Sequence, residues 1–221
     1  MVTEVDASLK HQLVSIPMGG ISLEGDLAVP TAAQGIVAFA HGSGSGRKSP
    51  RNQFVAQVLQ RAGLATMLLD LLTMDEEAID VQSMALRFDI DLLVERLTGT
   101  VDWLSANSET RELRIGLFGA STGAAAALVT AARRPDLVRA LVSRGGRPDL
   151  AADALASVHA PTLLIVGGND LEVLRLNRAA YAGMTAERQL VVVPGATHLF
   201  QEPGTLGEVA RLAADWFLAH L

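Results

Sequence analysis

A serine between two glycines is the residue with the clearest chemical potential. The segment Gly119-Ala120-Ser121-Thr122-Gly123 follows the apolar residues 115–118 and precedes the alanine-rich residues 124–132. This order predicts a buried strand, an abrupt turn and a helix. At such a corner the glycines allow a close backbone approach, and the serine hydroxyl projects beyond the carboxyl edge of the sheet. We interpret Ser121 as a candidate nucleophile, with a purely structural tight turn as the alternative.

A serine nucleophile needs a base, and two of the five histidines follow predicted strands. A neutral imidazole is suited to accept the serine proton. His198 follows the last predicted strand and comes after the serine and the acid, as in the chain order Ser…Asp…His, so it is the predicted base. His41 precedes a glycine-rich loop, and we interpret it as a brace for that loop through backbone hydrogen bonds. The remaining histidines, which do not follow a strand, are His11, His159 and His220.

The imidazolium that forms during catalysis needs a carboxylate to orient and stabilise it. Asp170 directly follows the predicted strand 162–166 and its Gly167-Gly168 turn, so it is the preferred partner. Glu172 is the fallback, and its structural role would be first-turn charge at a helix N-terminus. Asp70 also ends a predicted strand, but we interpret it as structural because it precedes the serine in the chain.

The loop His41-Gly42-Ser43-Gly44-Ser45-Gly46 follows the apolar run 35–40 and is the candidate oxyanion loop. The N–H of Thr122 is one natural oxyanion donor, and the N–H of Ser43 is the predicted second, with Gly44 as the alternative. A glycine-rich turn can also cradle phosphate. However, the spacing misses the dinucleotide fingerprint and lacks the glycine that a P-loop places before its lysine. The residues predicted to line the substrate pocket are His41, Gly42, Gly44, Arg47 and Arg144.

Four arginines near these loops have two open interpretations. They either brace the loops or bind an acidic group of the substrate. No histidine pair has helical ligand spacing and the chain has no cysteine, so neither a metal site nor a cofactor is predicted. The four arginines are Arg47, Arg51, Arg144 and Arg147.

The composition favours a single globular domain over residues 1–221, with 49% hydrophobic and 19% charged residues. A net charge of −6 argues against nucleic acid or an anionic membrane as partner. Residues 1–10 are mixed and polar without an apolar signal segment, and no apolar run approaches membrane-spanning length. The absence of cysteine suits a reducing cytoplasm, which is the expected location.

Apolar runs alternate with helix-like segments, which predicts a mostly parallel sheet with helices on both faces. The chain opens with two strand-like segments joined at Gly19-Gly20, a dipeptide that favours a tight hairpin, so one early strand should be antiparallel. Ligands bind beyond the carboxyl ends of strands in such sheets, and this is where the serine, the acid and the base are expected. The eight predicted strands are residues 12–18, 21–29, 35–40, 64–69, 115–118, 138–143, 162–166 and 189–193.

Helices are predicted between most of these strands. Ser49 as N-cap and Pro50 as first-turn residue predict a helix through Ala62. Residues 71–85 are less regular. From about Leu86, apolar residues recur at threes and fours, which predicts a long helix. Its expected solvated side carries Asp89, Asp91, Glu95 and Arg96, and further helices are expected over residues 124–132, 150–157, 172–181 and from 206.

Four motifs in order carry a resemblance to a known family: His41-Gly42-Ser43-Gly44-Ser45-Gly46, Gly119-Ala120-Ser121-Thr122-Gly123, Gly167-Gly168-Asn169-Asp170 and Gly195-Ala196-Thr197-His198. The chain resembles an α/β-hydrolase, and more narrowly the small, cap-less dienelactone hydrolase family, from about Gln12 to its end. This resemblance implies a Ser/Cys–His–Asp triad that hydrolyses esters or lactones without a cofactor. The enzymes that give the family its name use cysteine where this chain has Ser121. Serine suits ordinary ester hydrolysis.

Together these residues predict a serine carboxylesterase that cleaves small or accessible esters through an acyl-enzyme on Ser121, with His198 as base and Asp170 as its orienting acid. The expected partner is therefore a small-molecule ester. Lactone or thioester hydrolysis of the dienelactone hydrolase type is the near alternative, because the acyl-transfer machinery is shared. A non-catalytic binding module on the same fold is the more remote alternative.

Overall fold

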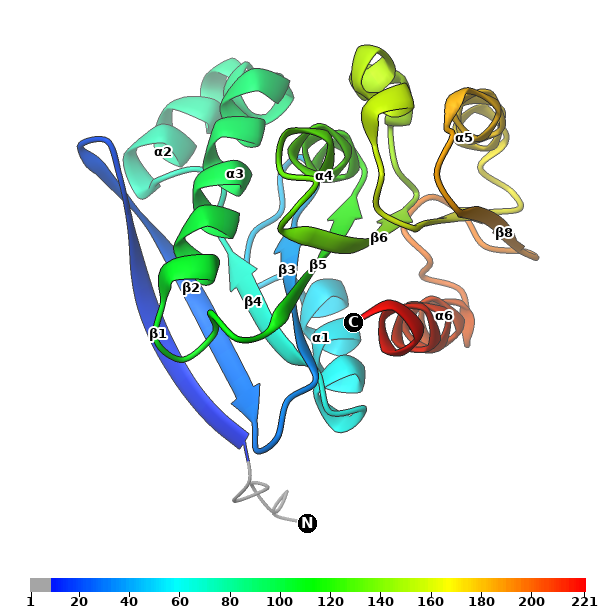
Figure 1. Cartoon of the computed structure of the whole chain (residues 1–221). Coiled ribbons are helices and arrows are strands. Elements are labelled where there is room, and N and C mark those ends of the chain that lie inside the picture. The colour runs from blue at the N-terminus through cyan, green and yellow to red at the C-terminus, as the bar shows by residue number, and fades with distance from the viewer. Residues whose placement is uncertain (1–8) are drawn as a thin grey trace.

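The computed structural model describes residues 9–221, except for the side chain of Ala152. Residues 1–8, which belong to the stretch predicted to hold no signal segment, lie outside the described residues. One sheet has the strand order β1-β2-β4-β3-β5-β6-β7-β8 (Figure 1). The strands are β1 (Leu9–Met18), β2 (Ile21–Pro30), β3 (Gly35–Ala40), β4 (Ala65–Leu69), β5 (Arg114–Ala120), β6 (Val138–Arg144), β7 (Thr162–Gly167) and β8 (Arg188–Val193).

The opening hairpin is confirmed. Gly19 and Gly20 have φ values of +52° and +104°, and positive φ at both central residues is typical of the turns that match the twist of a two-residue hairpin. β1 pairs antiparallel with β2, and β2 pairs antiparallel with β4. All later neighbours pair in parallel. β2 is therefore the one strand that runs against the sheet, as predicted.

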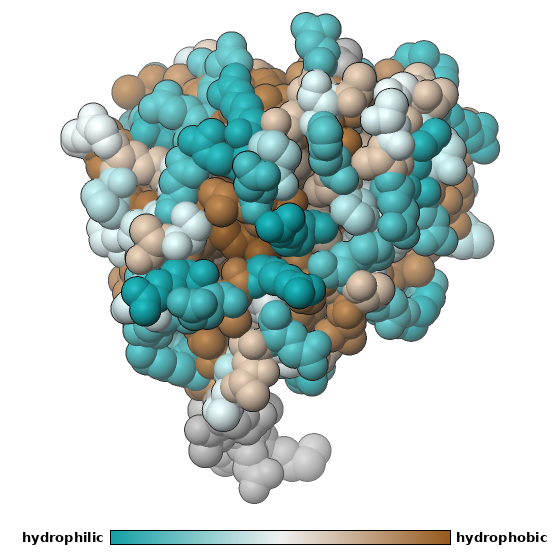
Figure 2. Space-filling model, in the orientation of Figure 1, coloured by the Kyte–Doolittle hydropathy of each residue, from teal (hydrophilic) through white to brown (hydrophobic). Residues whose placement is uncertain are grey.

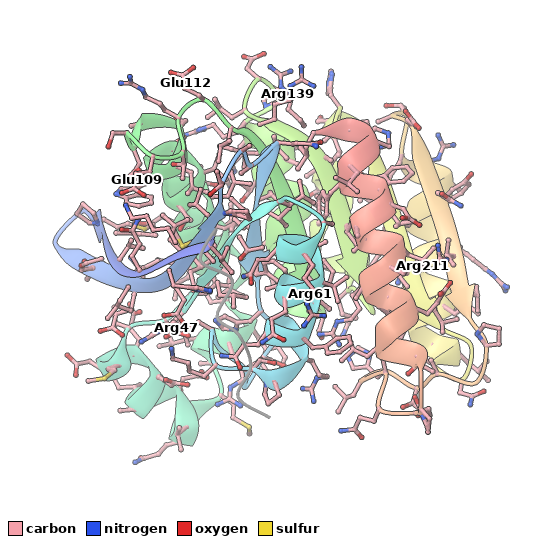
Figure 3. All side chains as sticks on the ribbon, turned by 90° about the horizontal axis from the view of Figure 1, so that it is seen from below. Arg47, Arg61, Glu109, Glu112, Arg139 and Arg211 are labelled. Carbon is pink, nitrogen blue, oxygen red and sulfur yellow. The ribbon has the colours of Figure 1, made fainter. Side chains whose placement is uncertain are left out.

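Helices cover both faces of the sheet (Figures 1 and 3), which explains why every residue of β3, β4 and β7 is buried. Helices α1 (Pro50–Arg61) and α6 (Thr205–His220) lie side by side on one face, and Val55, Leu59 and Phe217 belong to the core there. The opposite face is covered by α3 (Ile90–Ala106), α4 (Thr122–Arg133), the 3₁₀ segment η2 (Pro148–Ser157) and α5 (Leu171–Gly183). The predicted α/β-hydrolase architecture without a cap domain is confirmed.

Helix α4, which follows the candidate nucleophile, is buried between neighbouring elements. Its first two turns include Ala124, Ala125, Ala126 and Ala127, and each of these alanines is fully buried. Small side chains let a helix approach the sheet closely, so this alanine run places the helix N-terminus directly beyond the end of β5.

The segment predicted to be irregular, residues 71–85, contains a helix, α2 (Met74–Ser83). The helix begins with a capping box in which the Thr73 hydroxyl accepts a hydrogen bond from the Glu76 N–H and the Glu76 carboxylate accepts one from the Thr73 N–H. Sequence analysis missed this helix because its apolar residues form no buried stripe: Asp80 is its only buried residue. The short 3₁₀ segment η1 (Leu86–Phe88) then leads into α3.

Helix α3 has one further difference from the prediction. Arg96 was expected on the solvated side, but it is buried and donates a hydrogen bond of 2.8 Å to Glu76. Glu76, which belongs to the capping box of α2, thereby links α2 to α3.

Hydrophilic side chains cover most of the face seen in Figure 2, with apolar side chains between them. None of the helices formed by residues 9–221 combines the length and apolar character needed to cross a bilayer.

Candidate active site

Ser121 lies at a sharp corner between β5 and α4. Its φ of +51° and ψ of −119° are a strained conformation for a residue with a side chain. The flanking glycines are required by close contacts: a Cβ at Gly119 would lie 2.4 Å from the Cα of Ala124, and one at Gly123 would lie 2.2 Å from the carbonyl oxygen of Ala40. The G-x-S-x-G spacing therefore lets β3, β5 and α4 meet at this corner.

The loop after β6 holds the strained corner from both sides. The Ser121 N–H donates to the Arg144 carbonyl over 3.3 Å, and the Arg147 N–H donates to the Ser121 carbonyl over 3.1 Å. Buried Asn177 supports the same loop, because its Nδ2 donates to the Gly146 carbonyl over 2.9 Å. Sequence analysis did not identify this support, since nothing in the local pattern links Asn177 on α5 to the serine.

The predicted acid and base form a close pair. Nδ1 of His198 lies 2.6 Å from Oδ2 of Asp170. An imidazole N–H that donates to this carboxylate leaves Nε2 free to accept a proton. The Asp170 side chain is 15% exposed and that of His198 39%, so the carboxylate is shielded while the imidazole faces solvent.

Hydrogen bonds between the loops after β7 and β8 position this pair. The Gly168 N–H donates to the Val193 carbonyl, and the Asn169 side chain donates to the Gly195 carbonyl. A Cβ at Gly167 would lie 2.4 Å from the Ala196 carbonyl oxygen, so only glycine permits this approach. The residues before the acid are thus the ones that hold the histidine loop against it.

Glu202 secures the other side of the histidine loop. Its carboxylate accepts hydrogen bonds from the Thr197 N–H over 3.1 Å and from the Thr197 hydroxyl over 2.6 Å. Thr197 immediately precedes the histidine, so Glu202 restricts where the imidazole lies. Sequence analysis did not predict this role.

Ser121 and His198 line the same cavity of about 130 Å³. Among the hydrogen bonds of residues 9–221, none joins the Ser121 hydroxyl to His198. Such a bond is often long in a substrate-free enzyme and shortens when substrate binds. The other residues around this cavity are Gly42, Ser43, Ser45, Arg51, Ala120, Arg144 and Leu199.

The glycine-rich loop lies directly against the serine. A Cβ at Gly42 would be 3.1 Å from the Cβ of Ser121. The backbone N–H groups of Ser43 and Thr122 donate to no other group in the part of the chain that the structure describes. Both are therefore available as donors to an oxyanion.

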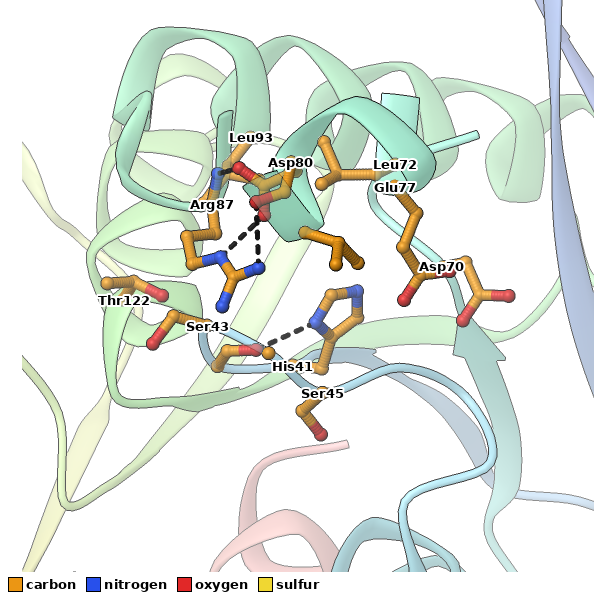
Figure 4. A pocket seen from close by; sticks show the side chains of 13 residues that line it. His41, Ser43, Ser45, Asp70, Leu72, Glu77, Asp80, Arg87, Leu93 and Thr122 are labelled. Carbon is orange, nitrogen blue, oxygen red and sulfur yellow. Dashed lines mark hydrogen bonds and ion pairs between the residues drawn. The ribbon is translucent and has the colours of Figure 1, made fainter. Parts of the chain in front are cut away.

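A second cavity of about 240 Å³ is also lined by Gly42, Ser43 and Ser45 of this loop (Figure 4). The predicted pocket residues His41, Gly42 and Gly44 line it together with Thr122. Helix α2 and η1 supply much of the remaining wall, which sequence analysis missed along with the helix. That wall includes Glu77, Asp80, Val81 and Arg87.

Asp80 and Arg87 are joined by several hydrogen bonds in that wall. The Asp80 carboxylate accepts hydrogen bonds from the Leu86 N–H over 2.8 Å, the Arg87 N–H over 3.1 Å and Nε of Arg87 over 2.5 Å. A residue in the left-handed conformation, Met84 with φ of +53°, ends α2 and makes this return of the chain possible. The pair anchors η1 beside the glycine-rich loop (Figure 4).

His41 braces the glycine-rich loop, in agreement with its interpretation. The Leu71 N–H donates to Nε2 of His41 over 2.9 Å, so Nδ1 carries the proton and donates to the Gly42 carbonyl over 3.0 Å. Burial lowers the pKa of His41 below its ordinary value of 6.5, and the Gly42 bond and the charges of Asp70 and Glu77 oppose this only in part.

Arg47 was predicted to line the substrate pocket, and its position in the structure differs from that prediction. It lines neither cavity, because its guanidinium pairs with the carboxylates of Asp70 and Glu24, and its N–H donates to Asp70 over 2.7 Å. Asp70 is structural, as interpreted: it fixes the loop through Arg47. Arg147 is likewise paired, with Asp149 at 2.7 Å. Arg51 and Arg144, by contrast, line the cavity that contains Ser121.

The lowered pKa of His41 predicts a stability change with pH. Below pH 6.5 the unfolded chain binds a proton at this histidine that the folded protein does not. The free energy of unfolding should therefore fall as the pH drops from 6.5 toward the folded-state pKa of His41, by at most about 1.4 kcal/mol per pH unit from this one group.

Urea unfolding of the protein and of His41→Gln between pH 7.5 and 5.5 measures this effect. Glutamine retains an acceptor for the Leu71 N–H but does not titrate. The variant should show a shallower loss of stability on acidification, and equal slopes for the two proteins would contradict the assignment to His41.

Comparison with known proteins bears on the family and the fold. A model of the "Dienelactone hydrolase family" matches residues 24–220. The crystal structure of a dienelactone hydrolase from Anabaena variabilis is 56% identical, with a TM-score of 0.96, and the match covers 97% of this chain and 99% of that chain. Est1E from Butyrivibrio proteoclasticus, solved with bound ferulic acid, has a TM-score of 0.80 at 17% identity, over 94% of this chain and 98% of that one. At that identity the likeness concerns the fold alone.

A longer relative carries a different name. The Mycobacterium tuberculosis protein named "Putative phosphoribosyl transferase Rv0571c" is 56% identical over 216 residues, which are 98% of this chain and 48% of that protein. This chain thus spans about half the length of the curated relatives it matches.

Proposed function

This chain belongs to the dienelactone hydrolase family, and on that premise we propose that it is a serine hydrolase of the carboxylesterase type. The observation that carries the proposal is the His198–Asp170 pair at 2.6 Å, whose imidazole lines one cavity with Ser121. A strained serine, an oriented imidazole and free N–H donors are the parts that acyl transfer requires.

In the proposed reaction the Ser121 oxygen attacks the ester carbonyl carbon while Nε2 of His198 takes the hydroxyl proton. The N–H groups of Thr122 and Ser43 stabilise the negative oxygen of the tetrahedral intermediate, and Asp170 stabilises the imidazolium. The carbon–oxygen bond to the alcohol then breaks, and His198 protonates the leaving alcohol. Water, deprotonated by His198, attacks the acyl-enzyme and releases the acid, which restores the serine. No cofactor takes part in these steps.

The substrate proposed for this site is a small or accessible carboxylic ester, because the cavity beside Ser121 is small and residues 9–221 form no cap domain over it. Lactone and thioester hydrolysis use the same steps, and lactone hydrolysis is favoured by the name of the Anabaena relative. The phosphoribosyl transferase name belongs to a protein about twice as long and is not part of the proposal. A cytoplasmic location remains a prediction.

Purified protein is expected to hydrolyse p-nitrophenyl acetate with a pH-dependent rate. His198 must be neutral to accept the serine proton, so kcat/KM should fall by about tenfold per pH unit on the acidic side of the profile. A rate that does not depend on pH would argue against His198 as base. A parallel panel of esters, lactones and thioesters separates the three substrate classes.

A further inference from the structure

Arg144 is a buried cation beside the candidate nucleophile. It is the last residue of β6, where it is paired with Ala120 of β5, and its carbonyl accepts the Ser121 N–H. The residue is only 7% exposed. Among residues 9–221 its guanidinium has no side-chain hydrogen bond and no carboxylate partner. Its recorded contact is with the ring of Phe200, 5.9 Å from Cζ to the ring centroid.

Arg51 is a second unpaired cation at the same cavity. It lies in the first turn of α1, and its Nε is buried without a hydrogen-bond partner. No ion pair of the described residues includes it. Burial first, and the positive charge of Arg51 second, lower the pKa of Arg144 to about 10. Arg144 therefore remains charged at neutral pH, in the same small cavity as Arg51.

Other shielded arginines of this protein are neutralised by the chain itself. Arg47 pairs with Asp70, Arg87 with Asp80, and Arg96 with Glu76. A buried charge without a partner is costly. Arg144 is such a charge, and Arg51, which is half-buried with an unpartnered Nε, lies at the same cavity on a different element. This arrangement indicates that a ligand supplies the missing negative charge.

We propose that Arg51 and Arg144 form an anion-binding subsite for a phosphate monoester group carried by the substrate. This inference rests on the proposed function for the role of Ser121. A phosphate monoester carries a charge of about −1.5 to −2 at neutral pH, which matches two guanidiniums, whereas a carboxylate carries one negative charge. Guanidinium N–H groups also bind phosphate oxygens in pairs. The substrate is thus an ester or lactone of a phosphorylated compound.

Binding of inorganic phosphate tests the subsite without requiring turnover. Isothermal titration should detect phosphate binding to the protein and equally to Ser121→Ala. The Arg144→Met variant should lose about tenfold or more in phosphate affinity, because it loses charge-assisted hydrogen bonds. Arg51→Met should lose affinity in the same direction, and its half-buried position on α1 makes it the variant to use if Arg144→Met does not fold.

Arg175→Met is the matched control, since Arg175 lies on the surface of α5 and pairs with Glu172. It removes the same charge and should leave phosphate affinity unchanged. Acetate should bind at least about tenfold more weakly than phosphate, in line with its smaller charge. Phosphate should also inhibit p-nitrophenyl acetate hydrolysis competitively.

The outcomes separate the two proposals. Phosphate affinity that is absent, or unchanged in both Arg144→Met and Arg51→Met, overturns the subsite. Acetate that binds as tightly as phosphate overturns the assignment to a phosphate monoester. Arginine-dependent phosphate binding in a protein that hydrolyses no ester supports the subsite and contradicts the proposed function. Ester hydrolysis without phosphate binding supports the proposed function and contradicts the subsite.

Discussion

Replacement of Ser121 with alanine is expected to lower kcat for p-nitrophenyl acetate by about 10⁴- to 10⁶-fold, because the variant has no hydroxyl to form the acyl-enzyme. Loss of the hydroxyl should not unfold the protein. The corner is held by backbone hydrogen bonds from the loop after β6, and these do not involve the serine side chain. The residual rate should reflect the oxyanion donors and substrate binding alone.

A fluorophosphonate probe gives a second measurement of the same prediction. The protein should be labelled stoichiometrically at Ser121, and Ser121→Ala should not be labelled. Ser49→Ala is a suitable control, because Ser49 is at the N-cap of α1 and its side chain makes no capping hydrogen bond. Turnover that survives in Ser121→Ala, or a label on another serine, would exclude Ser121 as the nucleophile. Absence of both turnover and labelling in the unaltered protein would support the non-catalytic alternative.

The Asp170→Asn variant is expected to lower kcat by about 10³- to 10⁴-fold. An asparagine amide that donates to Nδ1 would favour the imidazole tautomer whose Nε2 carries the proton, and that tautomer cannot accept the serine proton. The negative charge that stabilises the imidazolium would also be lost. The effect should lie mainly in kcat, since the 2.6 Å contact of Asp170 is with His198.

Glu172→Gln is the matched control for this prediction. Glu172 is the alternative acid from the sequence, but its carboxylate pairs with Arg175 at 2.7 Å and its side chain is 68% exposed. Its removal should change kcat by no more than a few-fold. A large loss in Glu172→Gln with little loss in Asp170→Asn would transfer the role of the orienting acid to Glu172.

The fold could be predicted because its signals are local. Strands buried on both faces produce continuous apolar runs. A Gly-Gly dipeptide between two short strand-like segments favours a hairpin. Each of the eight predicted strands overlaps an observed one, with differences of a few residues at the ends. Strand ends depend on where neighbouring strands stop donating hydrogen bonds, and this is not a local property.

Helix α2 shows the opposite case. Met74, Ile79 and Val81 are exposed, so the helix has no apolar stripe toward the core. It is stabilised instead by the Thr73–Glu76 capping box and by the bonds of Asp80 to η1. The residues of the capping box can be recognised in the sequence. The sequence does not show that the helix they begin forms part of the wall of the larger cavity.

The order of the site residues could be read from the sequence: a serine between glycines, an acid and a histidine, each after an apolar run that had to become a buried strand. Parallel strands place their carboxyl ends at one edge, so local chemistry was enough to bring these residues to the same region. Which charges are free to act there depends on the packing of the folded chain. Arg47 and Arg144 are alike in the sequence, but carboxylates on β2 and at the end of β4 neutralise the first, and no acidic side chain neutralises the second among the described residues. Ion pairing depends on which distant side chains come within a few ångströms of each other, and that is a property of the packed chain and not of any stretch of it.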